Sequence, residues 1–298
     1  MRSESPAARC ARLVKIYPST TGETHALRGI EASFPSGALT AVTGPSGSGK
    51  SSLLSVLALR ERPSGGELWI NERPMAVLSA RSLRLLRRYD VAWVAQRPTH
   101  SLFNDLTARE QVEQAARLRG ADLATCAGLI GRLGLTGRAR AGNRQLSGGE
   151  QQRLAVACAV IGAPRLVIAD EPTAELDDES SELVLAELRR CAELGCAVVF
   201  ATHDHRAVAA ADRVLHLRYG VLSTEAVSGS AATAAIDSTG RIQLPPQALG
   251  LFPGGRAQVV IEGRGVWLLA PSHLDDEGNS EGDGDGDGAS GRKRDGHG

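Results

Sequence analysis

The chain has 298 residues, of which 42% are hydrophobic and 23% are charged, so it has enough apolar side chains for a buried core and length for about two domains. Its formal net charge is zero, which argues against nucleic acid or an anionic membrane surface as the partner. The five cysteines lack C-x-x-C spacing and form an odd set, which excludes a disulfide framework or a zinc site and indicates the reduced thiols of a cytosolic protein.

The sequence shows no membrane segment. No window approaches the roughly 18 consecutive apolar residues of a membrane span. The first ten residues lack the apolar centre of a signal peptide. We therefore expect that a membrane role would require another chain to hold this one at the bilayer.

Short apolar runs between residues 11 and 34, separated by a polar loop over Ser19 to Thr24, predict antiparallel strands. Tyr17 lies in the first run. Its ring is suited to stack on a nucleotide base, although a half-buried strand tyrosine is an equally ordinary explanation.

A glycine-rich loop follows the apolar run 39–43 and precedes a helical pattern that begins at Leu53. It fits G-x-x-x-x-G-K-[ST] in the strand, loop and helix context that this pattern requires. Successive backbone N–H groups of such a loop point at an anion, and the following helix offers its N-terminal N–H groups. We expect Lys50 to reach the β- and γ-phosphates and Ser51 to hold Mg²⁺. The loop residues are Gly44, Pro45, Ser46, Gly47, Ser48, Gly49, Lys50, Ser51 and Ser52.

The next buried-strand pattern, residues 91–95, ends at Gln96, where ligands bind in parallel sheets, although an ordinary polar loop residue would also fit. Residues 107–142 are rich in Ala, Leu, Arg and Glu and predict a helical subdomain, with an outer face suited to docking. Its apolar positions Leu123, Ala127, Ile130 and Leu133 are expected to share one buried face.

A second anion cradle is predicted at Ser147, Gly148 and Gly149, which open a helix that continues through Glu150 to Ile161. The chain thus has one nucleotide loop but two phosphate-binding helix ends. This mismatch indicates that the second end serves a phosphate bound to another copy.

Two further apolar strands end in polar side chains. Residues 165–169 lead into Asp170 and Glu171, which are suited to orienting Mg²⁺ and to deprotonating an attacking water. A helix cap with a solvated neighbour is the alternative for this pair. Residues 197–201 lead to His203, which would contact a transferring phosphoryl group.

Together these motifs resemble the ATP-binding cassette (ABC) ATPase family over about residues 11–223. The resemblance implies a P-loop α/β fold with a mixed sheet, antiparallel N-terminal strands and a helical subdomain. Gly44 to Ser51 is similar to the family's phosphate loop, Leu146 to Gln151 to its signature sequence and Leu166 to Glu171 to its Mg-binding strand. Gln96 is similar to the Q-loop glutamine, Ala174 to Asp177 to the D-loop, His203 to the switch histidine, and Tyr17 to the base-stacking aromatic.

The resemblance implies an ATPase that uses ATP and Mg²⁺. The catalytic set would be Glu171, His203 and Gln96, the metal set Ser51, Gln96 and Asp170, and Asp177 would line the nucleotide site. It also implies a head-to-tail homodimer, with each ATP between the phosphate loop of one copy and the signature of the other. The dimer would drive a separate integral-membrane permease from the cytoplasmic, inner face of the cell membrane.

Within the family, Lys15 to Pro18, His25 to Gly29 and Leu146 to Arg153 look most like the lipoprotein-release and macrolide-export subgroup. Residues 97–103 depart from that subgroup's usual Phe-Asn-Leu-Leu pattern. Because this loop borders the coupling region, the departure bears on the permease type rather than on the ATPase.

Composition divides the chain into 1–227, the ATPase domain, 228–272, a small domain, and 273–298, an acidic, Gly-rich tail expected to be disordered. The pattern Asp237 to Pro245, then Leu249 to Gly254 and an alternating hairpin, resembles the AbrB-like swapped-hairpin fold of intertwined homodimers. Its few arginines favour a second dimer contact or regulation over DNA binding. The alternative function is a soluble ABC-type ATPase with a regulatory or DNA-targeting role.

Overall fold

The computed structural model describes residues 6–20, 22–227, 233–234, 236, 242, 244, 248, 250–252, 256–263 and 265–269. The chain divides into two compact units, Met1–Leu244 and Pro245–Gly298. Of the small-residue linker that composition predicts at 228–233, only Thr233 is described. The predicted tail 273–298 lies outside the described residues, as do residues 237–241 and 253–255 of the predicted small domain. The predicted boundary after residue 227 stays a prediction.

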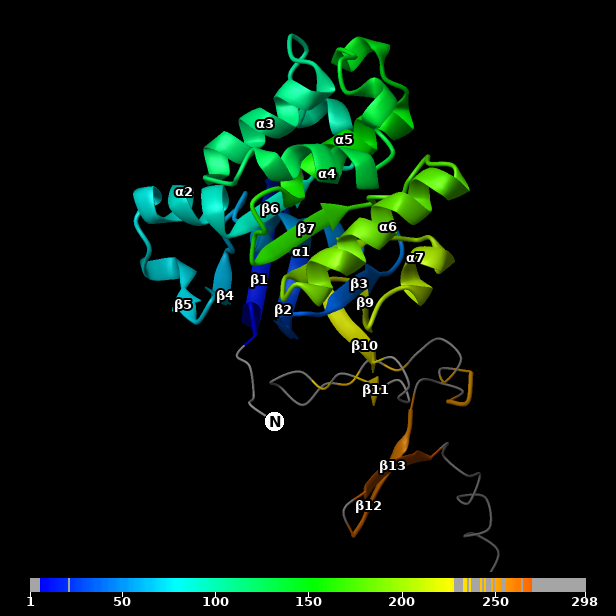
Figure 1. Cartoon of the computed structure of the whole chain (residues 1–298). Coiled ribbons are helices and arrows are strands. Elements are labelled where there is room, and N and C mark those ends of the chain that lie inside the picture. The colour runs from blue at the N-terminus through cyan, green and yellow to red at the C-terminus, as the bar shows by residue number, and fades with distance from the viewer. Residues whose placement is uncertain are drawn as a thin grey trace, which may run out of the picture. The chain divides into compact units, whose positions relative to one another are not determined.

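A seven-stranded mixed sheet organises the first unit (Figure 1). Its strand order is β11-β10-β9-β3-β8-β7-β6, in which β9, β3, β8, β7 and β6 are parallel, and β10 pairs antiparallel with both β9 and β11. The strands are β3 (Leu39–Thr43), β6 (Val91–Val94), β7 (Leu166–Asp170), β8 (Ala197–Ala201), β9 (Arg213–Arg218), β10 (Val221–Val227) and β11 (Thr233–Ala234).

The central strands are apolar on both faces because each face packs on a separate core. In β7, Val167 and Ala169 join one hydrophobic cluster, whereas Leu166 and Ile168 join the other. The second cluster includes α1 (Lys50–Leu57) and a four-stranded antiparallel sheet of order β2-β1-β4-β5. The strands of that sheet are β1 (Ala8–Ser19), β2 (Gly22–Phe34), β4 (Gly65–Ile70) and β5 (Arg73–Pro74).

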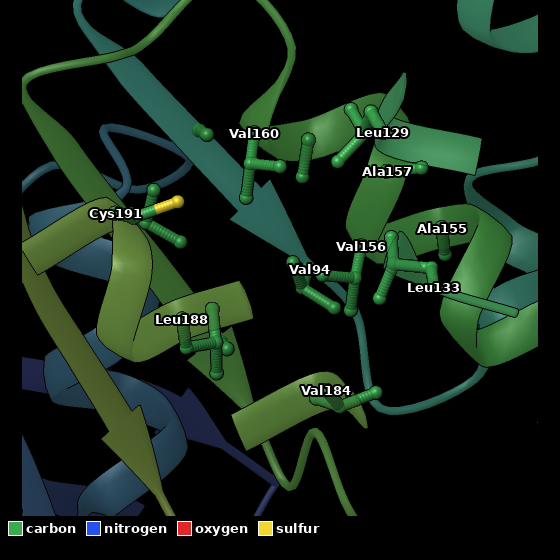
Figure 2. Close-up of a cluster of buried hydrophobic side chains, with 14 of the residues drawn as sticks. Val94, Leu129, Leu133, Ala155, Val156, Ala157, Val160, Val184, Leu188 and Cys191 are labelled. Carbon is green, nitrogen blue, oxygen red and sulfur yellow. The ribbon is translucent and has the colours of Figure 1, made fainter. Parts of the chain in front are cut away.

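The first cluster packs the large sheet against helices from later in the chain. Figure 2 shows side chains of α5 (Gly148–Val160) and α6 (Asp178–Glu193) gathered around Val94 of β6, with Leu129 of α4 above them. Of these helices, α5 begins at the second anion cradle predicted from the sequence, and α6 begins directly after Asp177. The remaining elements are η1 (Met75–Val77), α2 (Ala80–Tyr89), η2 (Pro98–His100), α3 (Ala108–Arg119), α4 (Ala124–Arg132), η3 (Thr136–Arg138), η4 (Asn143–Gln145) and α7 (His205–Ala209).

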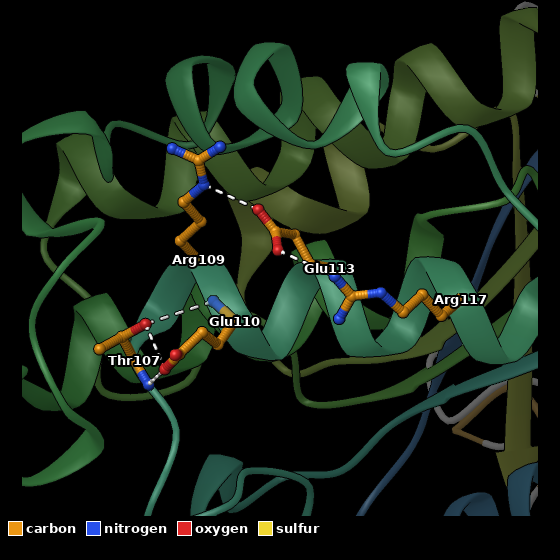
Figure 3. Close-up of polar contacts among 5 residues, drawn as sticks. All are labelled: Thr107, Arg109, Glu110, Glu113 and Arg117. Atoms are coloured by element: carbon orange, nitrogen blue, oxygen red, sulfur yellow. Dashed lines mark hydrogen bonds and ion pairs between the residues drawn. The ribbon is translucent and has the colours of Figure 1, made fainter.

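The two ends of the predicted helical subdomain pair with each other. An antiparallel bridge joins Thr107 to Gly142, and the Ala108 N–H donates to the Ala141 carbonyl at 2.9 Å, so the segment begins and ends at one place. Figure 3 shows how its first helix starts: Glu110 and Thr107 form a reciprocal capping box that satisfies two backbone N–H groups. On the same helix Glu113 pairs with Arg109 at 2.7 Å and with Arg117 at 3.4 Å, one turn away on either side.

Two sequence predictions need correction. Leu123 and Ala127 are exposed, and the buried face of α4 is made by Cys126, Leu129 and Ile130, followed by Leu133. The helix is one residue out of the expected phase because it starts at Ala124 and packs on α3 and α5. The polar loop predicted over 19–24 is also shorter, since β1 continues to Ser19 and β2 begins at Gly22.

In the second unit, β12 (Gln258–Glu262) and β13 (Gly265–Leu269) form an antiparallel hairpin, as the alternating pattern predicts. Upstream, Ile236 and Ile242 form an isolated antiparallel bridge. Among the described residues, no helix is both long enough and apolar enough to cross a bilayer.

Candidate functional site

The glycine-rich loop lies where β3 ends and α1 begins. Gly44 and Gly49 have φ values of 141° and 105°, which disfavour residues with a Cβ. A Cβ on Gly44 would lie 2.1 Å from the Leu217 carbonyl oxygen, and one on Gly49 would lie 2.4 Å from the Ala26 carbonyl oxygen. Both the backbone conformation and the available space therefore require glycine at positions 44 and 49. These two positions carry no side chain that could stand between the loop backbone and a ligand.

The start of α1 is open to an anion. Its N-cap is Gly49, which has no side chain to satisfy the first N–H groups, and its first turn holds no acidic residue. The buried hydroxyl of Ser48 has no hydrogen-bond partner among the described residues. Uncapped N–H groups beside an unpartnered buried hydroxyl fit a phosphate chain, whose oxygens would accept from both.

Lys50 closes the loop on itself. Its ammonium group donates to the carbonyl oxygens of Gly44 at 2.7 Å and Pro45 at 3.1 Å. These acceptors are neutral, so a phosphate oxygen would be a stronger partner for the same donor. Lys50 can therefore exchange loop carbonyls for a γ-phosphate without a change in its charge.

Sheet topology brings the predicted acidic, amide and imidazole groups to this loop. Parallel pairing aligns Val94 with Ala169, Asp170 with Ala201 and Ala201 with Val42. This alignment therefore places Gln96, Glu171 and His203 at the same edge of the sheet as the glycine loop. Gln96 itself is exposed.

Asp170 and Ser51 form the hard-oxygen pair that Mg²⁺ prefers. Burial raises the pKa of the Asp170 carboxyl, as does the neighbouring charge of Glu171, while a hydrogen bond from Ser51 and the charge of Lys50 oppose the rise. Within the described part of the chain, no group of three or more His, Cys, Asp or Glu side chains could hold a metal. The donor set thus fits a cation that also takes oxygens from phosphate and water.

The Glu171 backbone has a positive φ of 49°, a conformation that residues other than glycine seldom adopt. Its N–H donates to the Ala201 carbonyl at 3.0 Å, which ties it to β8. Both of its carboxylate oxygens lie 3.0 Å from Nδ1 of His203. The Glu171 carboxylate is 14% exposed and the His203 imidazole 78%, so a mostly buried carboxylate pairs with an exposed imidazole. The two residues line a cavity of about 260 Å³ with residues of the D-loop-like segment.

Tyr17 approaches the loop from β1. Its hydroxyl donates to Glu61 at 2.8 Å, and it also shares a hydrogen bond with Ser52 of α1. Burial raises the pKa of this phenol. The hydroxyl is therefore anchored while the ring stays half-buried beside the phosphate-loop helix.

The predicted signature residues lie at the start of α5. Ser147 and Glu150 form a capping box, in which the Ser147 oxygen accepts from the Glu150 N–H at 3.2 Å and Glu150 accepts from the Ser147 N–H at 2.8 Å. The backbone N–H of Ser147 lowers the pKa of Glu150, and Arg138 pairs with it at 2.8 Å. Glu150 thus caps the helix, and a hydrogen bond from the Ser147 hydroxyl also lowers its pKa. Ser147 and Gly148 are exposed.

The signature and the phosphate loop are not joined within one chain. No hydrogen bond or ion pair links residues 147–150 to residues 44–52 in the described structure. Asp177, which the sequence places beside the nucleotide, caps α6 by accepting from the Ser180 N–H at 2.7 Å, and that N–H lowers its pKa. These groups face outward, where a second molecule could meet them.

Two residues that hold the glycine loop in place were not predicted from the sequence. His216 on β9 hydrogen-bonds to Thr43 at 3.0 Å, directly before the loop, and burial lowers its pKa. The Gly220 N–H donates to the Ser48 carbonyl at 3.0 Å. No sequence pattern marks His216 or Gly220 as a neighbour of the glycine loop, because both reach it only through the pairing of β9 with β3.

Comparison with known proteins agrees with this geometry. The family described as "ABC transporter" matches residues 27–174. A macrolide export ATP-binding/permease protein of Paracoccus denitrificans is 38% identical over 76% of this chain and 34% of its own length. A pyoverdine export ATP-binding/permease protein of Pseudomonas fluorescens is 35% identical over 78% of this chain and 37% of its own length. The chain spans little more than a third of these relatives.

Solved structures are also similar to this chain. A dimeric ATP-binding cassette in a post-hydrolysis state, bound to ADP and Pi, superposes with a TM-score of 0.69 and 28% identity. The match covers 75% of this chain and all of that cassette. The part of the chain outside the match corresponds in size to the C-terminal addition.

Proposed function

The chain contains an ATP-binding domain of the ABC transporter family, and from this premise we propose that it hydrolyses ATP to energise a separate membrane permease. The observation that carries the proposal is the convergence of a bare phosphate loop, the Asp170 and Ser51 oxygens and the Glu171–His203 pair at one sheet edge.

Each side chain has a task in that reaction. ATP with Mg²⁺ supplies the phosphoryl group and neutralises charge as it transfers, with Ser51, Asp170 and Gln96 as the residues that would hold the metal. Glu171 accepts the proton of an attacking water, since its backbone N–H is fixed to the Ala201 carbonyl and its carboxylate is held by His203. Lys50 donates to the phosphate oxygens, and the Tyr17 ring packs on the base.

The site is completed by a second copy. Ser147 lies exposed at the start of α5, and nothing in the described part of its own chain brings it to Lys50. A head-to-tail homodimer would place the helix start of one copy against the phosphate loop of the other, and a solved cassette similar to this chain is dimeric in two structures. ATP binding then closes the dimer, and hydrolysis opens it.

Complementation between variants tests this arrangement. Lys50→Ala disables every phosphate loop and Ser147→Arg disables every signature, so each variant alone should be inactive. A mixture forms heterodimers with one intact composite site, and we expect ATP hydrolysis to return. If the mixture stays inactive while each variant still mixes with the unmodified chain, the composite site is wrong.

The permease is proposed from the relatives, whose names join an ATP-binding part and a permease; the match covers 34% and 37% of their lengths. We infer an export-type permease on a separate chain, with this subunit docked on the inner face of the membrane. Purification of the tagged full chain from solubilised membranes should recover an integral-membrane protein in a fixed ratio. Recovery of salt-sensitive DNA complexes without such a protein would favour the soluble, DNA-targeted alternative.

We propose that the C-terminal unit supplies the second dimer contact as an AbrB-like swapped hairpin. In the described hairpin, Ile261 is 77% exposed and Trp267 is 58% exposed, and an isolated two-stranded hairpin is marginal in water. Pairing with a second copy would cover these side chains. Truncation after residue 227 should remove any dimer that forms without nucleotide; a nucleotide-free dimer that survives the truncation would contradict this role.

A further inference from the structure

A second charged cavity, of about 440 Å³, lies at the far end of α1 from the glycine loop. Three of its lining residues are arginines, Arg60, Arg87 and Arg119, and only one, Glu61, is acidic. The arginines come from three separate segments: the residues after α1, the last turn of α2 and the end of α3. Their convergence is a product of tertiary packing.

Arg119 is the unusual member. Its Nη1 is buried and has no hydrogen-bond partner, and its guanidinium forms no ion pair with any described residue. Burial lowers its pKa, but arginine still keeps its proton at neutral pH. A buried, charged donor without an acceptor destabilises the fold unless a ligand pairs with it.

The only carboxylate in the cavity wall is already engaged. Glu61 pairs with Lys15 at 2.8 Å and accepts from the Tyr17 hydroxyl at 2.8 Å. Lys15 therefore balances its charge, and the three arginines leave the cavity strongly positive. A neutral or cationic occupant would not relieve that excess.

The walls also give the positive charge a defined geometry. The Arg60 guanidinium lies over the Trp93 ring, 5.3 Å from its centroid, which holds a flexible side chain at the cavity wall. A neighbouring cavity of about 290 Å³ shares Arg87, Trp93 and Arg119, so the same three side chains can be reached from two directions.

We propose that this cavity binds a phosphoryl group through Arg119, Arg60 and Arg87. A phosphate monoester or free phosphate carries up to two negative charges and several acceptor oxygens, which matches three converging guanidinium forks better than a single carboxylate does. The group belongs either to a free phosphate or to the headgroup of an anionic phospholipid. The site is separate from the ATP loop, and it does not depend on the proposed transport function.

Trp93 offers a local reporter. The chain has three tryptophans, Trp69, Trp93 and Trp267, so a Trp69→Phe/Trp267→Phe form of the full chain fluoresces from the cavity wall alone. Titration with inorganic phosphate should change Trp93 emission in a saturable way, whereas phosphate at the glycine loop should not. Arg119→Gln in this background should weaken the response by about 10-fold or more, the usual cost of losing a charged hydrogen-bond partner.

Arg84→Gln is the matched control, because Arg84 is an exposed arginine on α2 that lines neither cavity. It should leave the phosphate response unchanged, and unchanged ATP binding should show that Arg119→Gln is folded. Flotation with phosphatidylglycerol and phosphatidylcholine vesicles distinguishes a phospholipid headgroup from a free phosphate as the bound group. Arg119-dependent binding to phosphatidylglycerol alone identifies a lipid headgroup, and a phosphate response without vesicle binding identifies a soluble anion.

Three results would overturn the proposal. One is the absence of a saturable Trp93 response to phosphate. Another is an equal loss in Arg119→Gln and Arg84→Gln, which would reduce the effect to diffuse surface charge. The third is a response to a glutamate-rich helical peptide but not to phosphate, which would make the cavity a docking site for an acidic protein segment.

Discussion

Replacement of Glu171 by glutamine removes a proton acceptor while changing little else. The glutamine side chain has the same size, and its amide oxygen can still accept from Nδ1 of His203, which lies 3.0 Å from the carboxylate in the native protein. The backbone bond from residue 171 to Ala201 is untouched. We therefore expect normal folding and normal ATP binding.

The expected loss falls on the rate of hydrolysis. A positioned general base contributes about 10²- to 10⁴-fold, which corresponds to about 3–5 kcal/mol of activation free energy. Because the Glu171 carboxylate is only 14% exposed, bulk buffer has poor access to replace it as the proton acceptor. Turnover should therefore fall toward the upper part of this range, and ATP should accumulate in a closed dimer.

Phosphate release gives the rate, a fluorescent ATP analogue gives binding, and size-exclusion chromatography with ATP detects the dimer. Glu175→Gln is the control, because Glu175 lines the same cavity and also has a positive φ, 62°, but is exposed and has no contact with His203 among the described interactions. Hydrolysis by Glu171→Gln within a few-fold of the unmodified chain would refute the role of Glu171 as the base.

Three further changes test the framework around the site. Gly49→Ala should destabilise the fold by about 1–3 kcal/mol in urea unfolding and weaken ATP binding, because φ is 105° and the new Cβ would meet the Ala26 carbonyl. Arg132→Met should cost about 3 kcal/mol in the same assay, because it leaves the Glu187 carboxylate, 5% exposed, without its two bonds of 2.7 and 2.9 Å. Burial opposes ionisation of Asp212, yet Arg189 and the Leu39 N–H hold its pKa below the ordinary value. The stability that Asp212 contributes is therefore present above its pKa in the unfolded chain and is lost as the pH falls through its pKa in the folded protein. Asp212→Asn should accordingly make the urea midpoint less dependent on pH on the acid side.

Each change has a control elsewhere in the chain. Gly137→Ala adds a Cβ in open space at a residue without positive φ, and it should be nearly neutral. Adding Glu187→Met to Arg132→Met should recover stability, and failure to recover would show that packing rather than the unpaired charge is responsible. Asp105→Asn alters an exposed carboxylate and should leave the acid profile unchanged; an equal change in both profiles would contradict the assignment to Asp212.

Local chemistry made much of the first unit predictable. The phosphate loop was readable because glycine spacing, a preceding apolar strand and a following helix are all contiguous in the chain. The strands that end at Val94, Asp170 and Ala201 were predictable because a sheet buried on both faces requires continuous apolar runs. The capping box of Ser147 and Glu150 was likewise within reach, since its partners are three residues apart.

Other predictions failed or fell short because they depend on packing between distant segments. The buried face of α4 differs from the expected one since contacts with α3 and α5, rather than periodicity alone, set its phase. The contacts that hold Glu150, with Arg138 and with the Ser147 N–H, became visible only in the structure, and its place beside the nucleotide of a second copy stays a prediction.

By itself, then, the sequence determined which residues could handle a phosphate and which strands would carry them, because those features are written in consecutive residues. Only the tertiary structure decided which of them meet. The order β3-β8-β7-β6 brings Glu171 within 3.0 Å of His203 and leaves Ser147 facing outward. The same packing buries Nη1 of Arg119 without an acceptor, in a cavity that two other arginines also line. Such contacts join residues more than thirty positions apart, and their formation depends on the free energy of packing the whole domain rather than on any local pattern.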